Sequence, residues 1–222
     1  MELLSVTTAR TLWFFEANDT NPRGLDLSLT VFPALIQKYN FANHPTREDL
    51  YKPNREPGEK FIGGSFVNSE GRNITIHLTT FDDGFVAETR SSTRDSEDFL
   101  TELTQWMVKD FGLTFRPDMI RRRGYVSELF VKSDYHVTGL TSELQRFADK
   151  LSTFISGPDG PILYEPSGIS FAPNTSTALK PASLIFERAA DASFSENRYF
   201  SKAPVQTDIH LELLNELEQI LR

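Results

Sequence analysis

The amino-acid sequence predicts an α+β fold in which helices cover one face of an antiparallel-rich sheet. Segments with the two-residue periodicity of strands alternate with segments of helical periodicity, and the helical segments are apolar along a single stripe. The same order of elements, strand–helix–three strands–helix, occurs twice in the 222 residues. Helices with one apolar stripe suit a sheet that is covered on one face only. We therefore expect an internally duplicated chain.

The first half begins with an apolar strand at residues 10–17. Residues 29–39 carry apolar side chains at helical spacing, with Pro33 tolerable only in a first turn. A proline-bearing stretch at 42–60 predicts a long loop. Three strands follow, at 61–67, 73–81 and 85–91, and then a helix at 95–109 that Ser92 or a neighbouring polar residue caps.

The second half repeats this order. We expect a strand at 125–132, a helix at 140–155, a Gly/Pro-bearing loop at 156–167, strands at 168–172, 182–189 and 194–201, and a helix at 207–221. The apolar stripes of the two helices are expected to be buried; they comprise Leu140, Leu144, Phe147, Leu151, Phe154 and Ile155 in the first and Ile209, Leu213, Leu217 and Ile220 in the second.

The two halves, residues 1–117 and 118–222, are expected to share one sheet or core. Two such units around a pseudo-twofold axis would be saddle-like, and this architecture resembles the saddle of TATA-binding protein. No sequence motif of that family is present, and a shared architecture does not imply a shared function.

A hairpin in the first half supplies the candidate catalytic residues. Asp83-Gly84 is typical of a two-residue type I′ turn. In that register His77 lies opposite Arg90 and Thr79 opposite Glu88, all on the face without helices. Ile76, Leu78 and Ala87 share the other face and are expected to be buried against the helices. An enzyme could use His77 as a base oriented by Glu88, with Arg90 holding an anion; a solvated sheet face explains the same residues.

Charge and composition limit the classes of function. The chain has 23 Lys and Arg against 31 Asp and Glu, a net charge of −8, which disfavours indiscriminate binding to nucleic acids or anionic membranes. No cysteine is present, so thiolate catalysis and Cys-ligated zinc are excluded. The four histidines lack metal-ligand spacing, and we expect neither a metal nor a cofactor. No signal peptide or membrane span is evident, which indicates a cytoplasmic protein.

Candidate binding residues are aromatic or basic. The aromatic candidates are Trp13, Phe15, Tyr51 and Phe81, which either a core or a partner surface would explain. The only basic run is Arg121, Arg122 and Arg123, between the two halves.

These observations favour a non-catalytic cytosolic protein that binds another protein. Its acidic charge would steer a basic partner, as in an immunity protein or inhibitor; an assembly subunit is equally compatible, and homo-oligomers are possible. The first alternative is an enzyme or small-ligand binder that uses His77, Glu88 and Arg90. The second is a saddle-like nucleic-acid binder that uses the arginine run, although nucleic acid is the less expected partner.

Overall fold

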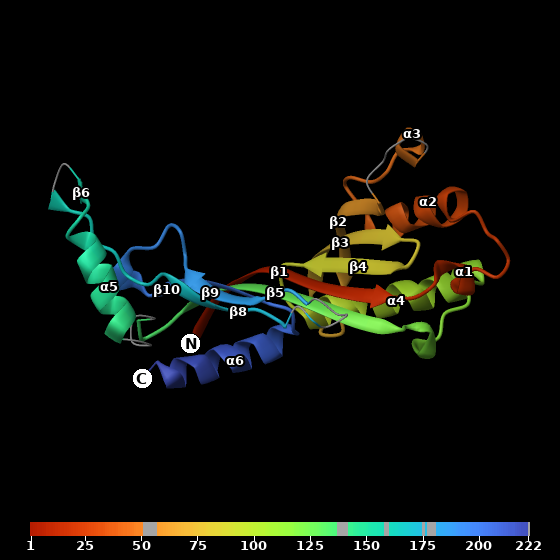
Figure 1. The fold of residues 1–222 in the computed structure, drawn as a ribbon. Helices are drawn as coiled ribbons and strands as arrows, with labels where there is room; N and C mark the ends of the chain where they lie inside the picture. Colours follow the sequence, from red (N-terminus) through yellow and green to blue (C-terminus); the bar gives the residue numbers. More distant parts are fainter. Residues whose placement is uncertain (51–56, 137–141, 158–159, 175, 177–180, 222) are drawn as a thin grey trace. The chain divides into compact units, whose positions relative to one another are not determined.

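The structure, a computed structural model, describes the chain except for residues 51–56, 137–141, 158–159, 175, 177–180 and 222 (Figure 1). The strands of its main sheet are β1 (Glu2–Phe14), β2 (Glu59–Val67), β3 (Asn73–Phe81), β4 (Gly84–Thr89), β5 (Arg122–Lys132), β8 (Gly168–Phe171), β9 (Leu184–Arg188) and β10 (Arg198–Ala203). A separate short hairpin consists of β6 (Ser156–Gly157) and β7 (Gly160–Pro161). The helices are α1 (Ala17–Thr20), α2 (Leu27–Tyr39), α3 (Arg47–Leu50), α4 (Thr93–Phe111), α5 (Ser142–Ser152) and α6 (Thr207–Ile220).

The eight strands are hydrogen-bonded in the order β2-β3-β4-β1-β5-β10-β9-β8. When β1 is matched with β5, β2 with β8, β3 with β9 and β4 with β10, this order reads the same from either edge. The pairings of β3 with β2 and β4, of β1 with β4, and of β9 with β8 and β10 are antiparallel. The predicted α+β fold with a large antiparallel sheet is confirmed.

The chain forms two compact units, which we describe separately. Unit 1 comprises Met1–Thr7, Glu128–Pro204 and Asp208–Arg222, and unit 2 comprises Thr8–Ser127 and Val205–Thr207. Both β1 and β5 are therefore divided between the units. The predicted halves at 1–117 and 118–222 remain a prediction.

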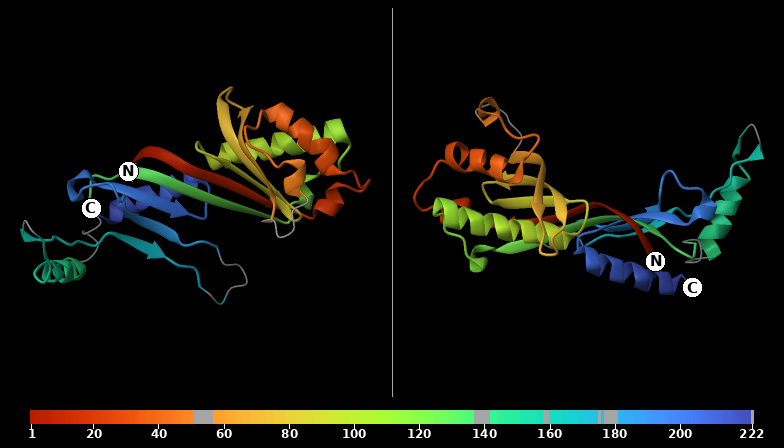
Figure 2. Two further views of the ribbon diagram at one scale, coloured as in Figure 1. Left: turned by 90° about the horizontal axis from the view of Figure 1, so that it is seen from above. Right: turned by 180° about the vertical axis from the view of Figure 1, so that it is seen from behind.

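Unit 2 buries one face of its strands under α2 and α4, which lie on the same side (Figure 2). Along β3, Ile74, Ile76 and Leu78 are buried and alternate with polar residues. They share a core cluster with Leu35 of α2 and Leu103 of α4. This arrangement follows from the two periodicities, since alternate strand positions meet one stripe of each helix.

Helix ends in unit 2 follow capping rules. Ser92 precedes α4 and accepts a hydrogen bond from the backbone N–H of Asp95, as expected. Helix α2 starts after Asp26, whose carboxylate accepts from the N–H groups of Ser28 and Leu29. Pro33, expected only in a first turn, lies beyond the first turn of α2.

The β3–β4 hairpin turns one residue earlier than the sequence predicts. Phe81 pairs with Gly84, so the turn residues are Asp82 and Asp83 and the glycine belongs to β4. The prediction of Asp83-Gly84 as the turn was wrong because this glycine has another role. A Cβ atom at Gly84 would lie 2.1 Å from the carbonyl oxygen of Trp13 on β1.

The earlier turn changes the cross-strand partners by two residues. His77 lies opposite Glu88 rather than Arg90, and Thr79 lies opposite Val86. A shift of two keeps each side chain on its predicted face, which is why the expected buried residues Ile76, Leu78 and Ala87 are buried.

The first residues of α4 and α6 bind each other reciprocally within unit 2. The N–H of Thr93 donates to Oγ1 of Thr207 at 3.0 Å, and the N–H of Thr207 donates to Oγ1 of Thr93 at 2.9 Å. Both residues are buried. Each hydroxyl therefore satisfies a backbone donor at the start of a helix that does not have an intrahelical acceptor.

We expect Thr93→Val or Thr207→Val alone to lower the free energy of unfolding by about 2 kcal/mol, because each leaves a buried N–H group without its acceptor. The double variant should lose about 1 kcal/mol less than the sum of the single losses, since the two groups form one network. Urea denaturation of all four proteins measures this coupling. Strictly additive losses would contradict the reciprocal pairing.

Unit 1 has its own core, formed by Leu129, Val131, Phe186, Tyr199 and Leu214. The predicted buried stripe of α6 is wrong at three of its four positions: Ile209, Leu213 and Ile220 are exposed, whereas Leu217 packs half-buried against the core and His210 and Leu214 are buried. The buried stripe is displaced by one residue because polar His210 and Glu218 find hydrogen-bond partners inside unit 1.

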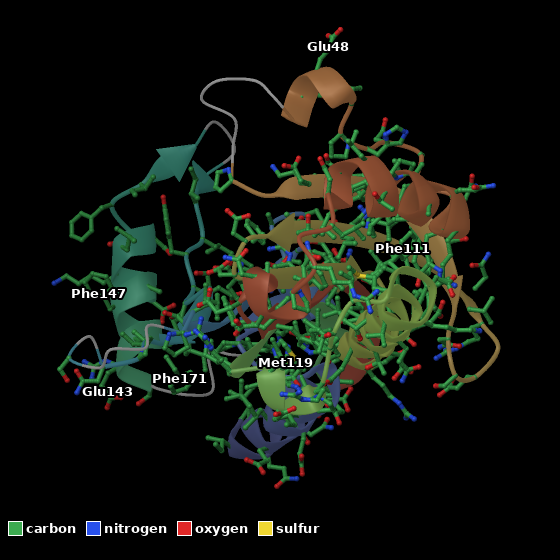
Figure 3. All side chains as sticks on the ribbon, turned by 90° about the vertical axis from the view of Figure 1, so that its right-hand side faces the viewer. Glu48, Phe111, Met119, Glu143, Phe147 and Phe171 are labelled. Carbon is green, nitrogen blue, oxygen red and sulfur yellow. The ribbon has the colours of Figure 1, made fainter. Side chains whose placement is uncertain are left out.

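Helix α5 also differs from expectation. Leu144, Phe147 and Phe154 were predicted to be buried, but they are 55%, 67% and 74% exposed. Figure 3 shows Phe147 projecting from α5. Only Ala148 and Ser152 of this helix are buried among its described residues, and Leu140 lies outside the described residues.

Other element boundaries shift as well. β1 starts at Glu2 instead of residue 10. The strand expected at 194–201 is a 3-10 turn at Phe194–Glu196 followed by β10, because Asn197 adopts a left-handed conformation between the two.

Candidate functional site

The face of the unit 2 strands that points away from α2 and α4 is the candidate site, and we call it the open face. Alternation with the buried residues of each strand assigns its members. They include Arg10, Leu12 and Phe14 of β1, Lys60 of β2, His77 and Thr79 of β3, Val86 and Glu88 of β4, Arg90 directly after β4, and Arg122 of β5. Among the described residues, the helices that pack on the unit 2 strands contribute to the core on the other face.

Arg122, the first residue of β5, and Phe14, the last residue of β1, lie together at one end of the strands on the open face. The guanidinium carbon of Arg122 lies 4.0 Å from the centroid of the Phe14 ring, in cation–π geometry. Gly124 is the next residue of β5 on this face. A Cβ atom there would contact Leu12 and the Phe14 ring at ordinary distances, so its absence leaves the side of the ring uncovered at this position. The result is a half-buried aromatic ring with an arginine guanidinium close above it.

The local charge of the open face is opposite to that of the whole chain. Among the members named above, Arg10, Lys60, Arg90 and Arg122 are cationic and Glu88 is the single carboxylate. Nε of Arg10 bonds the Glu88 carboxylate at 2.5 Å. The net charge of −8 therefore resides elsewhere on the chain, and this face is positive.

The predicted catalytic group is not assembled by hydrogen bonds. Nδ1 of His77 accepts from the backbone N–H of Gly63 at 3.0 Å, so in the neutral ring Nε2 carries the proton. Glu88 binds Arg10 instead of orienting His77. His77 and Arg90 do line a shallow hollow of about 490 Å³ with Thr75. The predicted orientation of His77 by Glu88 is therefore not present among the hydrogen bonds of these residues.

The arginine run is divided among three environments. Arg121 binds Glu16 at 2.7 Å, and Arg123 binds Glu97 of α4 at 3.2 Å and lies over the Trp13 ring on the helix side. Only Arg122 of the three lies on the open face. Strand alternation explains this separation, because consecutive residues of β5 point to opposite faces.

Tyr125 lies on the helix side of β5 beside Arg123. Its hydroxyl donates to the Glu97 carboxylate at 3.3 Å. Burial and the nearby Glu97 charge raise the pKa of Tyr125. The tyrosine is therefore a neutral hydrogen-bond donor that anchors β5 to α4 and holds its open-face residues in place.

The aromatic candidates separate in the same way. Trp13 and Phe15 are 4% and 3% exposed and belong to the core of unit 2, so they pack the interior in this structure. Phe81 is half-buried at the end of β3 beside a cavity. Tyr51 lies outside the described residues.

Unit 1 carries an aromatic pair on the side of its strands away from α6. The ring centroids of Phe130 and Phe200 are 5.7 Å apart, and both side chains are half-buried. Two residues from each ring along its strand, Nζ of Lys202 binds the Glu128 carboxylate at 2.8 Å. Lys132 at the end of β5 is exposed.

Sequence reasoning missed Arg10, Phe14, Phe130 and Phe200. The signal that could have identified them is strand alternation: Thr11 and Trp13 face the core, so their neighbours Arg10 and Phe14 must face away. The predicted strand at residues 10–17 already contained Arg10 and Phe14, but the face to which each of its side chains points was not assigned.

Among the described residues, no group of three or more His, Asp or Glu side chains is arranged to hold a metal ion. The described helices also include none that is both long and apolar enough to span a membrane.

No family model matches the chain, and no curated protein matches it. Among solved structures, the chain is similar to Methanococcus jannaschii TBP, with 13% sequence identity and a TM-score of 0.46, over 99% of this chain and 97% of that chain.

This finding corrects the leading functional expectation. A protein-binding module, whether an acidic immunity protein, an inhibitor or an assembly subunit, is not supported, and nor is the expectation that nucleic acid is an unlikely partner. At this level of similarity the match assigns no residue roles.

Proposed function

We propose that the protein binds nucleic acid through the open face of its sheet. The observation that carries this proposal is the Phe14 ring with the Arg122 guanidinium 4.0 Å from its centroid, on a positive, helix-free face of an acidic protein. Aromatic rings beside cations form stacking platforms for bases, and the cations contact the phosphate backbone.

The residues have distinct roles in this proposal. Phe14 offers a ring face on which a base stacks, an interaction of about 1–3 kcal/mol per base. Arg122 and Arg90 bind phosphate oxygens, whereas Arg10 is held in place by Glu88. In unit 1, Phe130 and Phe200 with Lys132 supply the same kinds of group.

The negative charge of the remaining chain makes the binding sensitive to salt. Phosphates are repelled by the acidic surface and attracted only by the open face, so the complex should form at low ionic strength and weaken steeply as salt rises. Indiscriminate binding over the whole surface is not part of this proposal.

Fluorescence anisotropy with labelled single-stranded and duplex DNA tests the proposal. At about 50 mM salt we expect Arg122→Ala to weaken binding about 10-fold, because it removes both a phosphate contact and the cation on the ring. Its slope of log affinity against log salt should also fall by about 1. Single strands should bind more tightly than duplex, since their bases are free to stack.

Arg121→Ala is the matched control. It removes the same charge one residue away, but Arg121 binds Glu16 and does not reach the open face. We expect it to weaken binding by less than about 3-fold. Equal losses for the two variants, or no binding of either DNA at low salt, would contradict the proposal.

We also propose that the two halves are duplicates. The support is the symmetrical strand order and the reciprocal bonds between Thr93 and Thr207, which each begin the last helix of a half. The saddle-like arrangement expected from the sequence goes with this duplication. The cytoplasmic location, also expected from the sequence, is a separate proposal.

A further inference from the structure

Unit 2 contains a cavity of about 600 Å³ between α2, α4 and the helix-covered side of the sheet. It lies on the opposite side of the strands from the open face, so it is independent of the proposed nucleic-acid binding. Its volume is within the range of about 300–1,000 Å³ that is typical of small-molecule sites.

The interior wall of the cavity is apolar. Side chains from every surrounding element contribute, and the apolar wall residues are Phe15, Leu27, Val31, Phe32, Leu35, Leu78, Phe81, Phe85, Leu103 and Met107. On one side of the cavity the rings of Phe15 and Phe85 pack edge to face, with their centroids 4.8 Å apart. Such a wall binds an apolar body by the area that it removes from water.

The polar part of the wall is acidic. Its charged members are Glu59, Asp82 and Asp83, and the described lining contains no lysine, arginine or histidine. The backbone carbonyls of Asp82 and Asp83 accept from the N–H groups of Ala17 and Phe15, which fixes the turn in position. Within the described residues, neither of these two aspartate carboxylates has a hydrogen bond or ion pair.

Two of the three uncharged hydroxyls in the described wall are already hydrogen-bonded, and the third, that of Thr80, is neutral and does not distinguish a cation from an anion. The Ser28 hydroxyl donates to Asp26 at 2.6 Å, and the Thr20 hydroxyl donates to the carbonyl of Ala17 at 2.7 Å. The carboxylates of the turn are therefore the groups available to select a ligand, and they select for positive charge.

We propose that this cavity binds an apolar amine, a small molecule with an alkyl or aromatic body and a single cationic head. The body lies between α2 and the sheet, and the ammonium group lies at Asp82 and Asp83. An acid of the same length would place its carboxylate beside these aspartates and be repelled.

Displacement of the fluorescent probe N-phenyl-1-naphthylamine tests the proposal. The competitors n-decylamine, n-decanol and decanoate share one body and differ in the charge of the head. We expect decylamine to bind about 10-fold more tightly than decanol and decanoate to be the weakest. Asp82→Asn with Asp83→Asn should bring decylamine to the affinity of decanol and leave decanol unchanged.

Two further variants complete the test. Asp98→Asn with Asp110→Asn removes the same charge from α4 outside the cavity and should leave the amine preference intact. Leu27→Trp places a larger side chain at the cavity wall and should abolish probe binding, with the fold checked by circular dichroism. Absence of probe binding, equal affinity for decylamine and decanoate, or an unchanged amine preference in the double aspartate variant would overturn the proposal.

Discussion

Gly84→Ala should lower the free energy of unfolding by about 3 kcal/mol, because a single added methyl group collides with the backbone of the neighbouring strand. The new Cβ atom would lie 2.1 Å from the carbonyl oxygen of Trp13 and 3.2 Å from Cα of Phe14. Neither atom can move without displacing β1, which lies at the centre of the sheet order. Overpacking costs about 1–3 kcal/mol, and the φ of +155° at Gly84 adds backbone strain.

Two other glycines serve as controls for Gly84. Gly71→Ala imposes only the backbone strain of a positive φ, since its Cβ atom would meet nothing within 4 Å. Gly124→Ala adds a methyl group at ordinary contact distance, 3.7 Å from Leu12. Each should lose about 1 kcal/mol or less in urea denaturation. A Gly84→Ala variant as stable as Gly71→Ala would show that β1 and β4 are not so close.

Gly84 also shows why the sequence predicts faces better than registers. The alternation of apolar residues assigned Ile76, Leu78 and Ala87 to the buried face, and burial confirms it. Asp-Gly is a frequent hairpin turn, but local turn preference competes here with the close approach of β1, a contact distant in sequence. The sequence pattern of the β3–β4 hairpin contains no information about β1, the strand that pairs with the other edge of β4.

The candidate site could be predicted only in part for the same reason. The order of elements and the open face follow from periodicity, and Arg122 was named within its run. The Arg10–Glu88 and Arg122–Phe14 pairs depend on which strands are neighbours, and sheet order is a tertiary property. The displaced stripe of α6 arose similarly, because apolar periodicity could not anticipate that His210 would be buried.

His210 has an environment that favours the neutral imidazole. It is fully buried, and its Nε2 lies 2.8 Å from the Ser201 hydroxyl. That hydroxyl donates its proton to the carbonyl of Ile185, so Nε2 must carry the proton and donate to Ser201. Nδ1 has no hydrogen-bond partner within the described structure. Protonation would place an unpaired cationic N–H group in the core of unit 1.

We expect the protein to lose about 3 kcal/mol of stability between pH 7 and pH 4 through His210 alone. Burial lowers its pKa from 6.5 to about 4. Between these values the unfolded chain binds a proton that the folded chain does not, so the free energy of unfolding falls as the pH falls. Each tenfold difference in proton affinity corresponds to about 1.4 kcal/mol, which gives this magnitude.

Urea denaturation across the pH range measures this loss of stability in the wild type. The comparison proteins are His210→Gln, whose new side chain cannot be protonated, and His44→Gln, which changes an exposed histidine. The wild type and His44→Gln should lose this stability in parallel, whereas His210→Gln should retain only the pH dependence of the carboxylates. The same pH dependence in all three proteins would show that His210 is protonated in the folded state, contrary to its burial.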